Sequence, residues 1–100
     1  SLSLQETRIT DDGLAHLADM SALWFLNLSD TAVTCSGLAH LAKLKDLRVL
    51  WLNRTGITDA GVRHLAAMTG LKKVHLSQTE ITAAGARRLQ EALPCIAILR

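Results

Sequence analysis

Apolar residues recur along the chain with a period of 24 residues and without insertion or deletion. The ladders include leucines at Leu4, Leu28, Leu52 and Leu76, threonines at Thr10, Thr34, Thr58 and Thr82, and glycines at Gly13, Gly37, Gly61 and Gly85. A fixed period of this length indicates a repeat protein in which each copy buries its apolar side against the next. We expect one domain over residues 1–100. Its four units lie at about 1–22, 23–46, 47–70 and 71–94, with a degenerate terminal strand at 95–100.

Within each unit, the spacing of the apolar residues changes once, from the period of a strand to that of a helix. Around the repeated L-x-L, Leu26 and Leu28 alternate with Phe25 and Asn27, which is the period of a half-buried strand. The next stretch has helical spacing, as at Leu38, Leu41 and Leu44. One strand and one helix per unit, joined by right-handed crossovers, predict an α/β stack with a parallel sheet.

Small residues mark the boundaries of these elements. The ladder that begins at Thr10 is expected to supply helix N-caps, because a hydroxyl can accept from a free amide of the first turn. A second threonine ladder is expected to bond to loop backbone and to neighbouring units; it comprises Thr7, Thr31, Thr55 and Thr79. The glycine ladder is expected to let each helix approach its neighbour closely.

The consensus L-x-x-L-x-L-x-x-T-x-[IV]-T-x-x-G resembles that of the leucine-rich repeat family over the whole chain. Copies that read T-D-x-G resemble a 24-residue class of predicted bacterial leucine-rich repeat proteins, although threonine stands where the family more often has asparagine. The resemblance implies a horseshoe-shaped solenoid with a parallel concave β-sheet and convex α-helices. Strands need about 4.8 Å each and helices about 8–10 Å, which bends the stack in that direction. The resemblance also implies protein binding.

Composition and charge exclude several classes of function. The net charge of +2 is too small to favour nucleic acid or a membrane surface. No apolar run approaches the roughly 18 residues that span a bilayer. Cys35 and Cys95 lie more than two units apart and are expected to be unpaired. Unpaired cysteines, together with the absence of a signal-like N-terminus, favour a cytoplasmic, reducing compartment.

Catalytic and metal chemistry finds little support. His16, His40 and His64 share one helical position, but equivalent side chains about 8–10 Å apart cannot share a zinc ion. Cys35 stands at a helix start, where a thiol can become reactive, but no base accompanies it. No phosphate loop, nucleophile elbow or carboxylate pair occurs. We expect a protein that is not an enzyme and that binds no metal, cofactor or small molecule.

All three aromatic residues fall on the strand face or its edge, and none on a core ladder. Phe25 and Trp51 are predicted to touch as diagonal neighbours on adjacent strands. Exposed aromatics grouped in this way favour a protein interface, unless the rings only cover each other or pack against a flanking segment. The predicted partner-binding residues are Trp24, Phe25, Asn27, Arg48, Trp51, Asn53, Arg54, Lys73 and His75.

Charge on the same face is unevenly distributed. Glu6 and Asp30 belong to the first two units, whereas the later units carry the basic residues Arg48, Arg54, Lys72, Lys73 and His75. An acidic patch on a partner would fit the basic end.

These observations predict a module that binds a protein partner through its concave face. The alternative is a structural spacer or scaffold segment of a larger protein whose activity lies elsewhere. Strand-face residues differ from unit to unit, which favours binding. The open strand edge of the first unit further predicts self-association through that edge.

Overall fold

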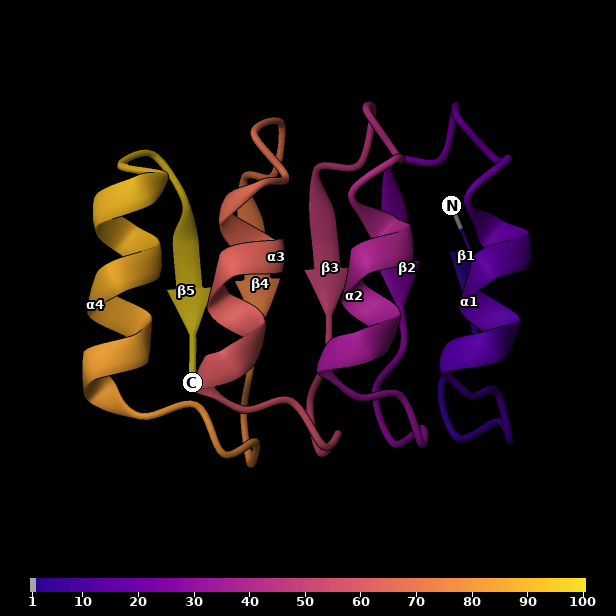
Figure 1. Cartoon of the computed structure of the whole chain (residues 1–100), viewed down its shortest axis with the longest axis horizontal. Helices are drawn as coiled ribbons and strands as arrows, with labels where there is room; N and C mark the ends of the chain where they lie inside the picture. Colours follow the sequence, from indigo (N-terminus) through magenta and orange to yellow (C-terminus); the bar gives the residue numbers. More distant parts are fainter. Residues whose placement is uncertain (1) are drawn as a thin grey trace.

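Strands and helices alternate along residues 2–100, which this computed structural model describes; Ser1, part of the predicted first unit, lies outside the described residues (Figure 1). The strands are β1 (Leu2–Ser3), β2 (Phe25–Asn27), β3 (Val49–Trp51), β4 (Lys73–His75) and β5 (Ala97–Leu99). The helices are α1 (Asp11–Leu17), α2 (Cys35–Leu41), the 3-10 turn η1 (Asp59–Gly61) that leads into α3 (Val62–Ala66), and α4 (Ala83–Ala92).

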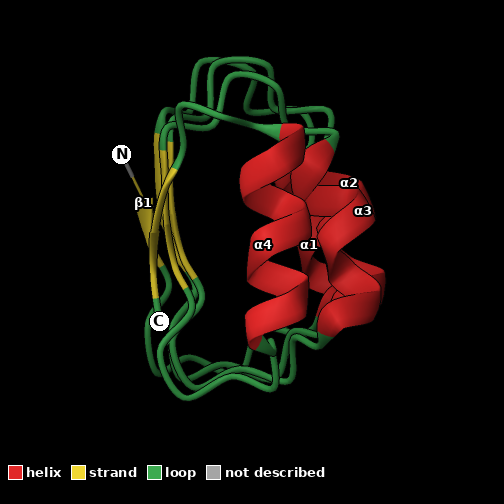
Figure 2. Ribbon diagram, turned by 90° about the vertical axis from the view of Figure 1, so that its left-hand side faces the viewer, coloured by secondary structure: helices red, strands yellow, loops and turns green. Residues whose placement is uncertain are grey.

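The strands form one parallel five-stranded sheet in the order of the sequence. Register partners are one repeat apart, as in Leu26 with Leu50 and Leu50 with Val74. The helices lie in one layer beside the sheet, and the other side of the sheet carries none of the described helices (Figure 2). We call that uncovered side the open sheet face. The predicted α/β stack and its register are confirmed.

Leucine ladders fill the space between the two layers. Leu26, Leu50 and Leu52 of the strand segments are fully buried, and so are Leu38 and Leu65 of the helices. Each such side chain stabilises the fold by about 1.5–3 kcal/mol on leaving water. Because a slip of one residue would turn a strand's leucines outward, this burial also fixes the register.

The two threonine ladders have different roles. Thr10, Thr34, Thr58 and Thr82 all occupy N-cap positions, as predicted. Only two of them accept from their own helix, Thr58 from the Ala60 amide and Thr82 from the Gly85 amide. The inner threonines each donate to a carbonyl three residues back in their own repeat, as Thr55 does to Leu52 at 2.7 Å. The expected bonds from these inner threonines to neighbouring units are therefore absent from residues 2–100.

A carboxylate at the start of a helix connects the first repeat to the second and the third repeat to the fourth. Asp11 accepts the backbone amide of Thr34 at 2.7 Å and its hydroxyl at 2.5 Å. Asp59 accepts the same two groups of Thr82 at 2.8 and 2.5 Å. Donation to a carboxylate does not prevent capping, because the Thr82 hydroxyl also accepts from the Gly85 amide.

The glycine ladder makes room for these carboxylates. A Cβ atom on Gly37 would collide with Asp11, and one on Gly85 would collide with Asp59. At Gly61 the neighbour is the Sγ atom of Cys35, 3.0 Å from the position of a Cβ. The predicted close packing is therefore confirmed at Gly37, Gly61 and Gly85. At each of these glycines, a side chain that packs closely is an aspartate or a cysteine of the preceding repeat.

One residue per repeat adopts a left-handed backbone after the strand. The four are Glu6, Asp30, Arg54 and Gln78, with φ of 62°, 59°, 56° and 58°. Left-handed conformations disfavour residues with a Cβ, so the same local strain occurs in every repeat.

Two further expectations concern cysteine pairing and membrane insertion. Cys35 and Cys95 are both free thiols, as predicted. None of the helices within residues 2–100 is long and apolar enough to cross a membrane.

Candidate protein-binding surface

Four rings from three consecutive repeats touch one another on the open sheet face. Phe25 and Trp51 meet edge to face with centroids 5.4 Å apart, so their predicted diagonal contact is confirmed. Trp24 packs on Phe25 at 6.0 Å. His75 packs on Trp51 at 4.5 Å with an interplanar angle of 35°. Edge-to-face and offset contacts of this kind are favourable geometries for aromatic pairs.

The register extends this cluster to the last strand. Trp51 is the register partner of His75, and His75 is the partner of Leu99. Leu99 is 40% exposed and Trp24 is 53% exposed, so both present apolar surface to solvent. We call Trp24, Phe25, Trp51, His75 and Leu99 the apolar strip. The sequence prediction omitted Leu99, although its place 24 residues after His75 was the signal that could have identified it.

The polar residues beside the strip are occupied by bonds within the protein. Asn27 is 4% exposed; its side chain donates to Gln5 and accepts from the Ser29 amide. The Oδ1 atom of Asn53 accepts from the backbone amide of Ser77 at 2.8 Å, and the backbone amide of Asn53 donates to the Ser29 hydroxyl. Asn27 and Asn53, predicted as partner contacts, therefore stabilise the exits of the strands. Asn27 is buried and Asn53 is half-buried, and alternation along the strand does not reveal the bonds that hold them.

The predicted basic end is partly neutralised. Arg54 donates from Nε and Nη2 to the two carboxylate oxygens of Asp30, at 2.5 and 2.7 Å. This bidentate pair holds the pKa of Asp30 below its ordinary value, with a smaller contribution from Gln5. Asp30 and Arg54, which were assigned to the acidic and basic ends, occupy the same position in adjacent repeats and neutralise each other.

The remaining basic residues differ in whether their charged groups are bonded within the protein. Arg48 folds back, and its Nη1 atom donates to the carbonyls of Lys45 and Leu47 at 3.1 and 3.3 Å. Lys72 and Lys73 are exposed and form no ion pair within residues 2–100. Lys73 lies on the strip's own face as the register partner of Val49. Free positive charge therefore remains at the start of β4.

The surroundings of His75 favour its neutral form. Burial lowers the pKa of His75 below its ordinary value of 6.5, and the charge of Lys73 lowers it further. Within the described residues, neither Nε2 of His75 nor Nε1 of Trp51 has a hydrogen-bond partner, although both atoms are buried. The stacked pair therefore behaves as an apolar surface.

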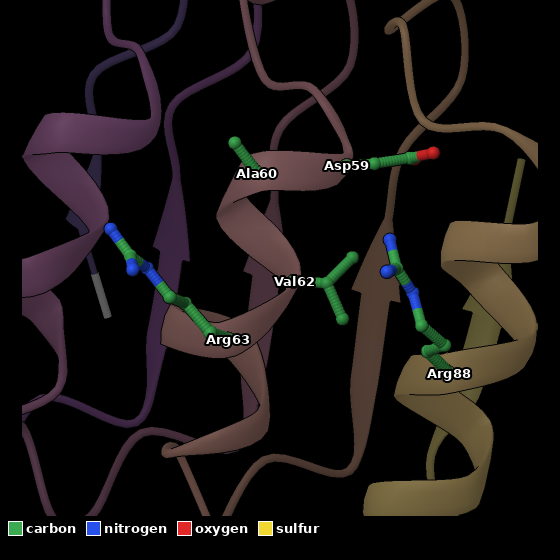
Figure 3. A pocket seen from close by; sticks show the side chains of 5 residues that line it. All are labelled: Asp59, Ala60, Val62, Arg63 and Arg88. Atoms are coloured by element: carbon green, nitrogen blue, oxygen red, sulfur yellow. The ribbon is translucent and has the colours of Figure 1, made fainter.

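The helix side carries an open groove with a volume of about 430 Å³ beside η1, α3 and α4 (Figure 3). Val62 and the guanidinium of Arg88 point into the space between α3 and α4, whereas Arg63 points toward α2 (Figure 3). Both oxygens of Asp59, at the rim, are bonded to Thr82. The residues that line the groove do not pair a nucleophile with a base.

The histidine ladder lies on the same helix side. His16 is exposed, and His40 and His64 are half-buried. Within residues 2–100, no three His, Cys, Asp or Glu side chains are close enough to hold a metal ion. Cys35, the other candidate for chemistry, contacts only Thr58 through hydrogen bonds, in a role described above for Asp11 and Asp59.

Comparison of the sequence finds no matching protein-family model and no characterised protein with a significant match. Comparison of the fold does find neighbours. Internalin C2 of Listeria monocytogenes superposes on 97% of this chain with a TM-score of 0.72 and 26% identity, and this chain spans only 40% of its length. A chain of the Chaetomium Mex67:Mtr2 structure matches over 98% with a TM-score of 0.75 and 16% identity, covering 76% of that chain.

A leucine-rich repeat protein of Leptospira interrogans matches over 97% of this chain, with a TM-score of 0.64, 20% identity and 30% of its own length covered. The neighbours from Listeria and Leptospira are leucine-rich repeat proteins. Together with the parallel sheet, the alternating helices and the 24-residue ladders, they show that the chain is an α/β leucine-rich repeat solenoid.

Proposed function

We propose that this chain is a protein-interaction module that binds its partner through the open sheet face, with Phe25 and Trp51 as the central anchors. The observation that carries the proposal is the contiguous apolar strip, whose outer members Trp24 and Leu99 are exposed. Interface energy concentrates in a few large side chains, above all Trp and Tyr, surrounded by near-neutral contacts. Lys73 supplies the polar edge of this surface.

The comparisons support a binding role. The Chaetomium neighbour was solved as an assembly of Mex67 with Mtr2. The T-D-x-G motif after the strands supports placing the chain in the 24-residue bacterial class of leucine-rich repeats. The proposal involves no catalytic step, because no side-chain constellation in residues 2–100 supplies one.

The alternative role as a spacer also has an observation in its favour. Bonds from Asp11 to Thr34 and from Asp59 to Thr82 tie successive repeats together, as a rigid spacer requires. The rings of the strip also cover each other in part. A spacer would leave the strip without a partner, so one experiment separates the two roles.

That experiment is affinity capture from the native source with the protein at its full natural length as bait. The wild type is compared with a Phe25→Ser/Trp51→Ser double variant and with Met20→Ser, which removes a 44% exposed apolar side chain outside the strip. Circular dichroism checks that all three remain folded.

We expect a partner that the wild type and Met20→Ser retain and the double variant loses, with an affinity loss of at least about 2 kcal/mol. If all three baits recover the same proteins, or none, the open sheet face is not the binding site. The spacer role would then take its place.

A further inference from the structure

The partner of the apolar strip can be described more closely, and this description rests on the proposed function. We infer that the strip receives an amphipathic helix whose apolar side is flanked by carboxylates. Three features of the open sheet face lead to this inference: the spacing of the strip, the saturation of the polar groups around it, and the position of free positive charge.

The spacing of the strip matches one side of a helix. Trp51, His75 and Leu99 form a row across β3, β4 and β5, with one side chain per strand. Neighbouring strands lie about 4.8 Å apart, and side chains three and four residues apart on a helix lie about 5–6 Å apart. A helix lying along this row would place one apolar side chain near each strand.

The backbone amides and carbonyls of the partner must form their hydrogen bonds without groups from the open sheet face. β2, β3 and β4 are each paired on both sides, so their backbone groups are used within the sheet. The side chain of Asn27 is also occupied, and the Oδ1 atom of Asn53 accepts the Ser77 amide. An extended segment would bring unpaired amides and carbonyls onto a surface that offers few partners, which costs free energy. A helix forms its backbone bonds internally.

Positive charge without an ion-pair partner among the described residues lies beside this row of side chains. Lys73 sits next to Val49 and Ala97 in the register, and its charge reaches His75, whose pKa it lowers. Neither Lys73 nor Lys72 forms an ion pair within residues 2–100. A carboxylate on the helix beside its apolar side would meet Lys73, and complementary charge of this kind fixes orientation and partner choice.

The probe is a random library of 16-residue peptides displayed on phage and selected on the immobilised full-length protein. Enriched peptides are synthesised, and their affinity is measured by fluorescence anisotropy and their structure by circular dichroism. The variants are Trp51→Ala, Lys73→Glu and, as a matched charge reversal outside the strip, Lys43→Glu.

We expect enriched peptides with apolar residues three and four apart, acidic residues beside them, and a gain of helix on binding. Trp51→Ala and Lys73→Glu should each weaken binding at least tenfold, whereas Lys43→Glu should have little effect. The loss caused by Lys73→Glu should shrink as salt is raised, because exposed charges are screened.

The outcomes separate this inference from the proposed function. Peptides that are lost with Trp51→Ala but bind Lys73→Glu as tightly as wild type, or bind without gaining helix, would overturn the acidic helix and leave protein binding at the strip intact. If no enriched peptide depends on Trp51, the helix inference fails, and the affinity-capture experiment still decides the proposed function. Binding of anionic phosphatidylserine vesicles that is lost with Lys73→Glu, in place of any peptide, would also overturn the inference.

Discussion

The thiol of Cys35 holds Thr58 in the same way that a carboxylate holds the equivalent threonine of other repeats. The Thr58 amide donates to Sγ at 3.4 Å, and the Thr58 hydroxyl lies 3.4 Å from the same atom. Asp11 makes the corresponding bonds to Thr34 at 2.7 and 2.5 Å. Sulfur is a weaker acceptor than an ionised carboxylate, so the connection between the second and third repeats is the weak one.

Replacing Cys35 by Asp should therefore stabilise the protein. The new carboxylate would form charge-assisted bonds to Thr58 and would stand in the first turn of α2, where the helix dipole favours it, for a gain of about 1 kcal/mol. Urea unfolding measures the change. The same substitution in a Thr58→Val background should gain less, because the hydroxyl is missing. A Cys35→Asp protein that is no more stable than wild type would show that the thiol is already an adequate partner.

Gly85→Ala should destabilise the protein, although alanine is the better helix former. In an exposed helix the change would gain up to about 1 kcal/mol. Here the new Cβ would lie 2.6 Å from Cγ of Asp59, and the overlap should cost about 1–3 kcal/mol. Chemical denaturation of the variant gives the sign directly.

Two controls tie that cost to the carboxylate. In an Asp59→Ala background, Gly85→Ala should become neutral or stabilising, a non-additivity that a double-mutant cycle detects. Gly56→Ala should be tolerated, since its Cβ would find only ordinary contacts, 3.5 Å from Thr34. A destabilisation by Gly85→Ala that persists without Asp59 would point to a different cause.

The sequence predicted the layers, the register and the Phe25–Trp51 contact because these follow from spacing along one strand or one helix. It did not predict the bond from Asp11 to Thr34, because two residues 23 positions apart meet only after the repeats stack. A local consensus shows that both are frequent, but it does not show that they touch.

The candidate site could be predicted from the sequence only in part, for the same reason. Alternation placed Asn27 and Arg54 on the open sheet face, yet it could not show that Asn27 is bonded to Gln5 or that Arg54 is paired with Asp30. Leu99 was overlooked because its strand was interpreted only as a closing element. Side-chain bonding between repeats decides which residues of the face are free for a partner, and periodicity does not determine that bonding.

Gln78→Gly should stabilise the protein. Gln78 has φ of 58° and an exposed side chain without a hydrogen bond to the described residues. Removing its Cβ relieves about 1–2 kcal/mol of left-handed strain, while the entropy of a new glycine costs about 0.5–1 kcal/mol. A net gain of about 0.5–1 kcal/mol is expected in urea unfolding. Ser77→Gly, at a residue outside the left-handed region, should instead destabilise; equal effects at both positions would remove the argument from strain.

Acid should weaken the fold through His75. Because burial and Lys73 lower the pKa of His75 in the folded protein, the unfolded chain takes up a proton first as the pH falls below 6.5. Stability should therefore decline from pH 6.5 down to the folded pKa and then level off for this residue. NMR titration of the His75 ring should give a midpoint below 6.5, and Lys73→Ala should raise it partway. His75→Gln should reduce the decline in stability over the same pH range; an unchanged decline would mean that His75 is not its source.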